Sequence, residues 1–359
     1  MRRWIWIILL VLLSVQTAEA TQLPQELQKA LPAEAEELLD ELQGSDSEDT
    51  LSGGLAALWN KGCSYFIGAL KERIGSVVIL LVIVLVCALA DDCFHAVESS
   101  RTADFAPLAG AAAITVAATG SIQSLMGMGL ATIEELHIFS KALLPTLAAA
   151  MAAGGGVVSA GLRHVAGVLF SDLLITMIRD LLMPLVYFYI IASAADAMLA
   201  GSRLKGIAKG IGKTIAWLLT GSLLLYTGYL SLSGTMAASA DSLATQVTRS
   251  AMGVVPVVGG IISDAAGTVL AGAAMLKNTI GVVGMLAVLA VCLVPFLELA
   301  AQYLLYKVAS YLAGTIGSPR LVGMIDALGS ALGMVLGMTG ACALMLLISV
   351  ITSVTVVTV

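Results

Sequence analysis

Charged residues are scarce in this chain, and their scarcity excludes an ordinary soluble domain. Asp, Glu, Lys and Arg make up 12% of the 359 residues, whereas hydrophobic residues make up 59%. The mean hydropathy is +0.98. A soluble domain needs a solvated surface, and typical soluble domains carry about 25% charged residues. We therefore expect an integral membrane protein.

Residue types that form catalytic and metal sites are also few. His95, His137 and His164 are far apart in the sequence, and no H-E-x-x-H pattern or Cys-x-x-Cys pair accompanies them. No P-loop or G-x-S-x-G pattern occurs either. The five cysteines stand alone and are expected to pack rather than to bind metal. We expect no catalytic residues, no metal, no cofactor and no enzymatic activity.

The net charge of -6 comes from one short segment. Nine of the 24 acidic residues fall between Glu26 and Asp49, whereas from Lys61 onward 15 basic residues accompany 14 acidic ones. No basic cluster is large enough to bind nucleic acid, and the acidic balance argues against such a partner.

The N-terminal part has the pattern of a targeting segment followed by an acidic region. Arg2 and Arg3 precede an apolar run and an Ala-x-Ala site ending at Ala20, so we expect a signal peptide over 1–20. An uncleaved anchor is the alternative. Residues 21–72 form an acidic extracytoplasmic segment, with two short amphipathic helices separated by Pro32. Either a partner docks on this small helical ectodomain, or it is a solvated lead-in to the membrane part.

Residues 73–359 form the predicted polytopic membrane domain, an all-α bundle. Six apolar stretches are long enough to cross a bilayer core of about 30 Å: 74–90, 105–130, 142–162, 214–234, 279–298 and 334–357. Residues 299–316 are expected to form an interfacial helix.

Two further apolar segments contain helix-breaking or charged residues. Segment 165–196 contains Arg179-Asp180 and Pro184, and segment 250–277 contains Pro256. We predict two re-entrant hairpins, a pattern found in transporter-type sites near the membrane midplane. Kinked ordinary spans are the alternative.

The orientation is predicted from the densest basic cluster, which should be cytoplasmic by the positive-inside rule. This cluster consists of Arg203, Lys205, Lys209 and Lys213. With two hairpins, Arg163-His164 and Arg320 would also be cytoplasmic, whereas Arg249 and Val359 would be outside.

Polar residues within the broken segments are candidates for a transport pathway. Asp264 lies in an apolar, glycine-rich stretch, where an ionisable group is costly unless it serves a partner or a pathway. Structural charge pairing is the alternative for Arg179 and Asp180. The candidate residues are Asp172, Arg179, Asp180, Pro256, Gly259, Gly260, Ser263, Asp264, Lys277 and Asn278.

Three glycines in the last predicted span are four residues apart and therefore share one helix face. These residues, Gly329, Gly333 and Gly337, would allow a close approach of two helices. The approaching helix belongs either to the same chain or to another copy.

Two blocks of sequence, together with the signal peptide, resemble the stage III sporulation protein AE family of endospore-forming bacteria. They are RHVAGVLFSDLLITMIRDLLMPLVYFYIIASAADAML from Arg163 and VPVVGGIISDAAGTVLAGAAMLKNTIGVVG from Val255. The resemblance implies a mother-cell protein in the outer forespore membrane, which is a cell membrane. It also implies partners: the other products of the stage III sporulation operon, including a secretion-type ATPase and ring-forming proteins, and a forespore membrane protein.

The function that this resemblance implies is that of a membrane-embedded export or channel component. The complex would be specific to sporulation, similar to a secretion system, and would link mother cell and forespore. An autonomous secondary transporter and a passive membrane scaffold for ring assembly remain as alternatives.

Overall fold

The computed structural model describes the chain as a set of long α-helices. The described residues are 50–97, 105–153, 156–199, 204–252 and 259–355, with side chains described for 60–93, 108–153, 156–199, 204–233 and 280–354. The elements are α4 (Thr50–Val97), α5 (Phe105–Ala153), α6 (Val157–Met177), the π-helix η1 (Ile178–Leu182), α7 (Met183–Met198), α8 (Lys205–Met252), α9 (Gly259–Ala313) and α10 (Pro319–Thr355).

Six of these helical units are long and apolar enough to cross a membrane, with α6, η1 and α7 counting as one unit. They cover Asn60–Cys93, Leu108–Ala153, Val157–Met198, Lys205–Ser233, Ile280–Ala313 and Pro319–Val354. No strand occurs among the residues that the structure describes. The prediction of an all-α polytopic membrane bundle is therefore confirmed.

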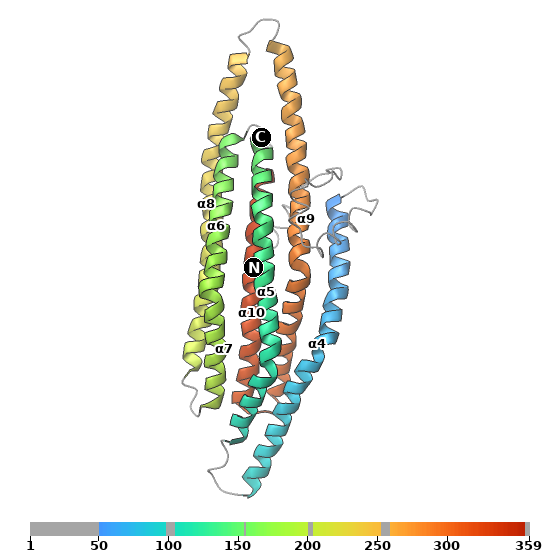
Figure 1. Cartoon of the computed structure of the whole chain (residues 1–359), viewed down its shortest axis with the longest axis vertical. Coiled ribbons are helices and arrows are strands. Elements are labelled where there is room, and N and C mark those ends of the chain that lie inside the picture. The colour runs from blue at the N-terminus through green and yellow to red at the C-terminus, as the bar shows by residue number, and fades with distance from the viewer. Residues whose placement is uncertain (1–49, 98–104, 154–155, 200–203, 253–258, 356–359) are drawn as a thin grey trace.

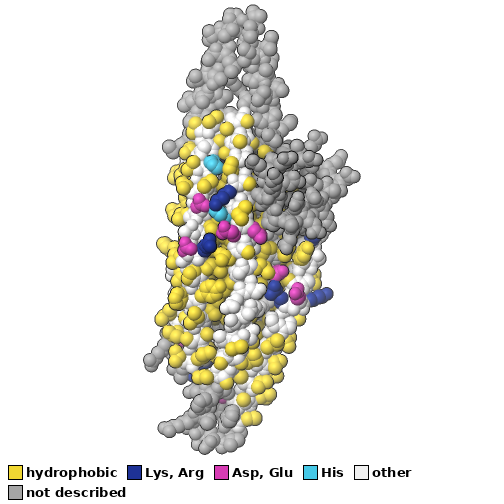
Figure 2. All heavy atoms as spheres, in the orientation of Figure 1, with side chains coloured by type: hydrophobic (Ala, Val, Ile, Leu, Met, Phe, Trp, Pro, Cys, Tyr) yellow, Lys and Arg dark blue, Asp and Glu magenta, His cyan; other side chains and the backbone are white. Residues whose placement is uncertain are grey.

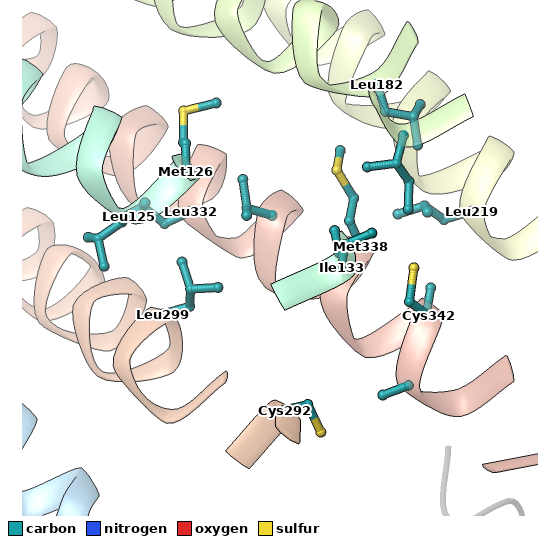
Figure 3. Packing of buried hydrophobic residues seen from close by; sticks show 14 of the residues in the cluster. Leu125, Met126, Ile133, Leu182, Leu219, Cys292, Leu299, Leu332, Met338 and Cys342 are labelled. Carbon is teal, nitrogen blue, oxygen red and sulfur yellow. The ribbon is translucent and has the colours of Figure 1, made fainter. Parts of the chain in front are cut away.

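Helix α10 lies at the centre of the bundle and packs against α5, α6, α7, α8 and α9. Figure 3 shows buried side chains of several helices gathered around it. Leu332, Val335 and Met338 of α10 have no exposed surface. Close approach to α5 depends on Gly129, because an added Cβ there would overlap with the Val335 side chain. The core is thus a helix surrounded by helices.

Helix α4 lies at the periphery, where it contacts α9 and α5 (Figure 1). Val77, Leu80 and Val84 are its buried apolar contacts. Two polar contacts also join it to α9: Arg73 donates to Glu298 at 2.5 Å, and Gln302 Nε2 lies 3.3 Å from Ser76 Oγ. These directional contacts add to the apolar packing and fix the register of the two helices.

The first predicted hairpin, 165–196, is wrong, because the chain runs through this segment as one helical unit. Pro184 cannot donate to the carbonyl of residue 180, which would interrupt an α-helix. The helix widens to a π-turn at this point, and the Met183 N–H bonds to the Ile178 carbonyl, five residues back. The π-turn lets the helix pass the proline without reversing direction.

The second predicted hairpin, 250–277, is also wrong. Its first residues end α8, and residues from Gly259 onward belong to α9, which continues to Ala313. The helix-breaking Pro256 lies in the connection between the two helices, outside the described residues. Gly259 and Gly260 begin α9, where the first N–H groups have no helical partner in any case. These residues mark a turn between helices.

The other span boundaries are corrected by the same helices. Residues 105–130 and 142–153 lie on one helix, α5, despite the charges between them and Pro145 within it. The predicted span 142–162 instead covers the end of α5 at Ala153 and the start of α6 at Val157. Residues 299–313 end α9 and form no separate interfacial helix.

Consecutive helical units run in opposite directions, so the connections alternate between the two ends of the bundle (Figure 1). Lys205, from the same basic cluster as Arg203, and Arg320 lie at one end, in keeping with their predicted shared side; Arg203 is outside the described residues. Arg249, at the end of α8, lies at the other end. Arg163 is near the start of α6 and so belongs to the end opposite Lys205, which contradicts the prediction that Arg163 and the basic cluster share one side.

Candidate polar site between α5 and α6

A polar pocket of about 580 Å³ opens on the surface between α5, α6 and η1. Its lining residues are Glu134, His137, Asp172, Ile175, Thr176, Arg179 and Asp180. Figure 2 shows charged and histidine side chains gathered at mid-height of the bundle, with hydrophobic side chains above and below them. Three of the predicted candidates, Asp172, Arg179 and Asp180, therefore meet in one pocket.

Helix periodicity brings these side chains together. Asp172, Thr176 and Asp180 follow at intervals of four residues along α6 and η1, so they lie on one face. Glu134 and His137 are three residues apart on α5 and share a face in the same way. Each helix thus contributes one polar stripe to the pocket.

A close polar contact between His137 and Asp172 joins the two helices. His137 Nε2 lies 3.1 Å from Asp172 Oδ1, with the imidazole 9% exposed and the carboxylate 52% exposed. His137 Nδ1 is buried and has no hydrogen-bond partner among the described residues.

The remaining charged groups of the pocket are unpaired. In the part of the chain that the structure describes, Glu134, Arg179 and Asp180 form no ion pair. Three carboxylates and one guanidinium give the pocket a formal charge of -2 when His137 is neutral. Arg179 and Asp180 also lie in the π-turn, a feature that frequently marks functional positions in helices.

Exposed apolar side chains on the same helical unit flank the pocket on both sides. Leu169 and Leu173 lie on either side of Asp172 in the sequence, at the first end of the pocket, and are 62% and 60% exposed. Phe188 and Ile191 follow the pocket and are each 62% exposed. A charged group at membrane depth is costly unless it has a partner or faces water. This charged site, surrounded by apolar surface, is therefore the strongest candidate for function.

The structure does not bring the second predicted group of site residues to this pocket. Pro256 lies outside the described residues. Gly259, Gly260, Ser263, Asp264, Lys277 and Asn278 lie on the first part of α9, where only the backbone is described. Figure 1 shows this part of α9 extending, with the end of α8, beyond the α5–α6 turn. The pocket lies lower, along α5 and α6.

Two glycines of the predicted glycine face contact α9. A Cβ on Gly329 would lie 3.0 Å from Tyr306 Cβ, and a Cβ on Gly333 would lie 2.9 Å from Tyr303 Cε2. A Cβ on Gly337 would meet nothing within 4 Å. The close approach thus involves two of the three glycines and a helix of the same chain.

A second polar group lies between α9 and α10. Lys307 Nζ donates to Asp326 Oδ1 at 2.6 Å and to Ser330 Oγ at 2.8 Å. These bonds satisfy the lysine within the chain, so we assign them a structural role. Among the described residues, no cluster of three or more His, Cys, Asp or Glu side chains could hold a metal ion.

Sequence reasoning missed Glu134 and His137, because the charged stretch around them was interpreted as a loop between two spans. Glu134, His137 and Lys141 follow one another at spacings of three and four residues. This helical spacing is the signal that could have identified them.

Comparison with known proteins identifies the family. The family model described as "Stage III sporulation protein AE" matches residues 34–357. The chain belongs to the stage III sporulation protein AE family. Its similarity to the stage III sporulation protein AE of Bacillus subtilis (strain 168) is 23% identity over 256 residues. This match covers 71% of the present chain and 63% of the relative. No solved structure matches the chain.

Membership in the stage III sporulation protein AE family gives the chain a role in sporulation. The six apolar helices give it the character of a membrane protein. The resemblance stated from the sequence is thereby confirmed.

Proposed function

We propose that this stage III sporulation protein AE family member is the membrane-embedded export or channel component of a sporulation-specific, secretion-like complex between mother cell and forespore. The observation that carries the proposal is the charged pocket on the π-turn, with apolar surface on both sides. Ionisable groups in such a position typically belong to a pathway or to a partner interface.

The proposed location is the outer forespore membrane on the mother-cell side. The proposed partners are the other products of the stage III sporulation operon, with a secretion-type ATPase and ring-forming proteins among them, and a forespore membrane protein. This assignment is supported by the family membership and by the helical hairpin of α8 and α9 that extends beyond the bundle (Figure 1).

Neutralising the pocket tests the proposal. In an endospore-forming host that carries this gene in place of its own copy, Glu134→Gln, Asp172→Asn and Asp180→Asn keep the side-chain shapes and remove the charges. We expect each variant protein to insert at normal abundance, and the triple variant to lose heat-resistant spores by at least about 100-fold, as a loss of roughly 3 kcal/mol would cause. Glu72→Gln, at an exposed carboxylate on α4, is the matched control.

The alternatives give different results. A passive scaffold would tolerate the triple variant, so normal spore numbers at normal abundance would contradict the proposal. An autonomous transporter would move solute in vesicles that contain the purified chain alone, whereas a component of a complex would be inactive there.

A further inference from the structure

We propose that the pocket between α5 and α6 binds a lysine or arginine side chain carried by a membrane-embedded segment of a partner polypeptide. The inference deepens the proposed function, because it names the chemistry that the same site recognises.

The charges of the pocket favour a cation. Glu134, Asp172 and Asp180 outnumber the one guanidinium, and Glu134 and Asp180 have no ion-pair partner among the described residues. The carboxylates come from both α5 and the α6–η1 unit, so a group in the pocket would contact both helices. A bound cation would offset the cost of holding these charges beside apolar surface.

The hydrogen-bonding groups of the pocket favour a donor-rich cation. Carboxylates accept hydrogen bonds only. His137 lines the same pocket, is 8% exposed, and has an Nδ1 without a hydrogen-bond partner among the described residues. A guanidinium offers five N–H donors and an ammonium offers three, and neither has an acceptor.

The size of the pocket favours a side chain over a bare metal ion. Its volume of about 580 Å³ is far larger than the roughly 30 Å³ that one water molecule occupies in the liquid. No described cluster of His, Cys, Asp and Glu could hold a metal ion. The volume accommodates a long basic side chain together with water.

The position of the pocket favours a guest that approaches within the membrane. The exposed leucines on one side and the exposed Phe188 and Ile191 on the other would face lipid or another helix. A transmembrane segment with one basic residue at the matching depth would cover this apolar surface and place its charge in the pocket. The guest is therefore expected on a membrane helix.

Binding of a defined helix in vesicles tests the inference apart from sporulation. The probe is a synthetic transmembrane peptide of leucine and alanine with one central arginine, compared with the same peptide carrying glutamine. Energy transfer from the labelled full-length chain, in phosphatidylcholine vesicles, measures the affinity. We expect the arginine peptide to bind at least about tenfold more tightly.

The preference should disappear in the Glu134→Gln, Asp172→Asn, Asp180→Asn triple variant and remain in Glu72→Gln. Asp180→Lys should abolish it as well, because two carboxylates and two cations leave the pocket with no net formal charge, which keeps the test informative if the triple variant folds poorly. Equal binding of the arginine and glutamine peptides to the unmodified chain would overturn the inference. Loss of the preference for the arginine peptide in phosphatidylethanolamine vesicles would also overturn the inference. That result would mean that the ammonium group of the lipid occupies the site.

Discussion

At the scale of single residues, the contact between His137 and Asp172 allows the effect of side-chain shape to be separated from that of charge. Asp172→Asn keeps an oxygen that can accept from Nε2, whereas Asp172→Ala leaves a buried imidazole with neither nitrogen bonded. An unsatisfied buried polar group costs about 1–3 kcal/mol. We therefore expect Asp172→Ala to lower the melting temperature of the purified protein in detergent, and Asp172→Asn to change it little. Equal melting temperatures for the two variants would show that the contact contributes nothing to stability.

Glycines at the contact between α9 and α10 provide a second prediction for single residues. Gly333→Ala places a methyl group 2.9 Å from the Tyr303 ring, and overpacking of this kind typically costs about 1–3 kcal/mol. Gly337→Ala, on the same helix and one turn further, enters open space and is the matched control. Thermal unfolding should distinguish the two variants. If Gly337→Ala destabilised the protein as much as Gly333→Ala, the contact with Tyr303 would not be the cause, since alanine favours a helix more than glycine does.

At the scale of elements, the π-turn predicts an unusual tolerance to deletion. A π-turn contains one residue more than the α-helix that it interrupts, so removing Leu181 together with Pro184→Ala should restore a regular α-helix and keep the register of α6 and α7. We expect the deletion variant to fold and insert, but to lose sporulation because Arg179 and Asp180 change position. Circular dichroism, abundance and spore counts measure these effects.

Deletion of Ile191 is the control for this experiment. It lies in the regular part of α7, where loss of one residue rotates everything beyond it by about 100°. That variant should be unstable. If the Leu181 deletion were as unstable as the Ile191 deletion, the π-turn would be required for folding.

The attachment of α4 rests on an ion pair that can be exchanged. Arg73→Glu leaves two carboxylates facing each other, and the double variant with Glu298→Arg restores the pair in reverse. Because both side chains are partly exposed, we expect a moderate loss of abundance in the single variant and recovery in the double variant, measured by immunoblotting of membranes. If the abundance did not recover in the double variant, the ion pair would not be what attaches α4 to α9.

At the scale of the whole molecule, six antiparallel crossings fix the side of each connection. In a chain whose five cysteines are replaced, a single cysteine at Val157 or Arg249 should react with an impermeant reagent from outside. A cysteine at Lys205 or Arg320 should react only after the cells are opened. Position 157 distinguishes the two topologies, because the predicted topology with two re-entrant hairpins would place this part of the chain at the cytoplasmic side. Protection of Val157 with labelling of Arg249 would contradict the six-helix order.

The sequence predicted the class of fold, because composition determines it. The number of complete spans agrees only because two errors cancel: 105–130 and 142–153 lie on one helix, and the predicted hairpin 165–196 belongs to a full span. The sequence-based prediction failed where a helix-breaking residue can be accommodated in two different ways. Pro184 looks like the end of a helix but is absorbed by a π-turn, and Pro256 looks like a break within the membrane but falls between two helices. The charges near His137 look like a loop, but they lie on one helix and form half of the pocket.

Only part of the candidate site was predicted, for a related reason. Asp172, Arg179 and Asp180 could be identified as charges in an apolar segment, since this needs only their neighbours in sequence. Whether they lie beside His137 depends on how α5 and α6 pack together. The sequence pattern did not reveal this packing, because a single span was predicted over 142–162, where α5 ends and α6 begins. Asp264 was chosen by the same reasoning about single charges, yet it lies on the extension of α9.

The lengths of α8 and α9 have a mechanical consequence. Helix α9 contains 55 residues, which at 1.5 Å per residue is about 82 Å, far more than a hydrocarbon core of about 30 Å. Long helices resist bending and compression. The part of α8 and α9 that extends beyond the bundle therefore sets a fixed distance between the bilayer and a partner bound at its end. Removing seven residues from each rod would shorten that distance by about 10 Å, so the extension defines how wide a gap the protein can bridge.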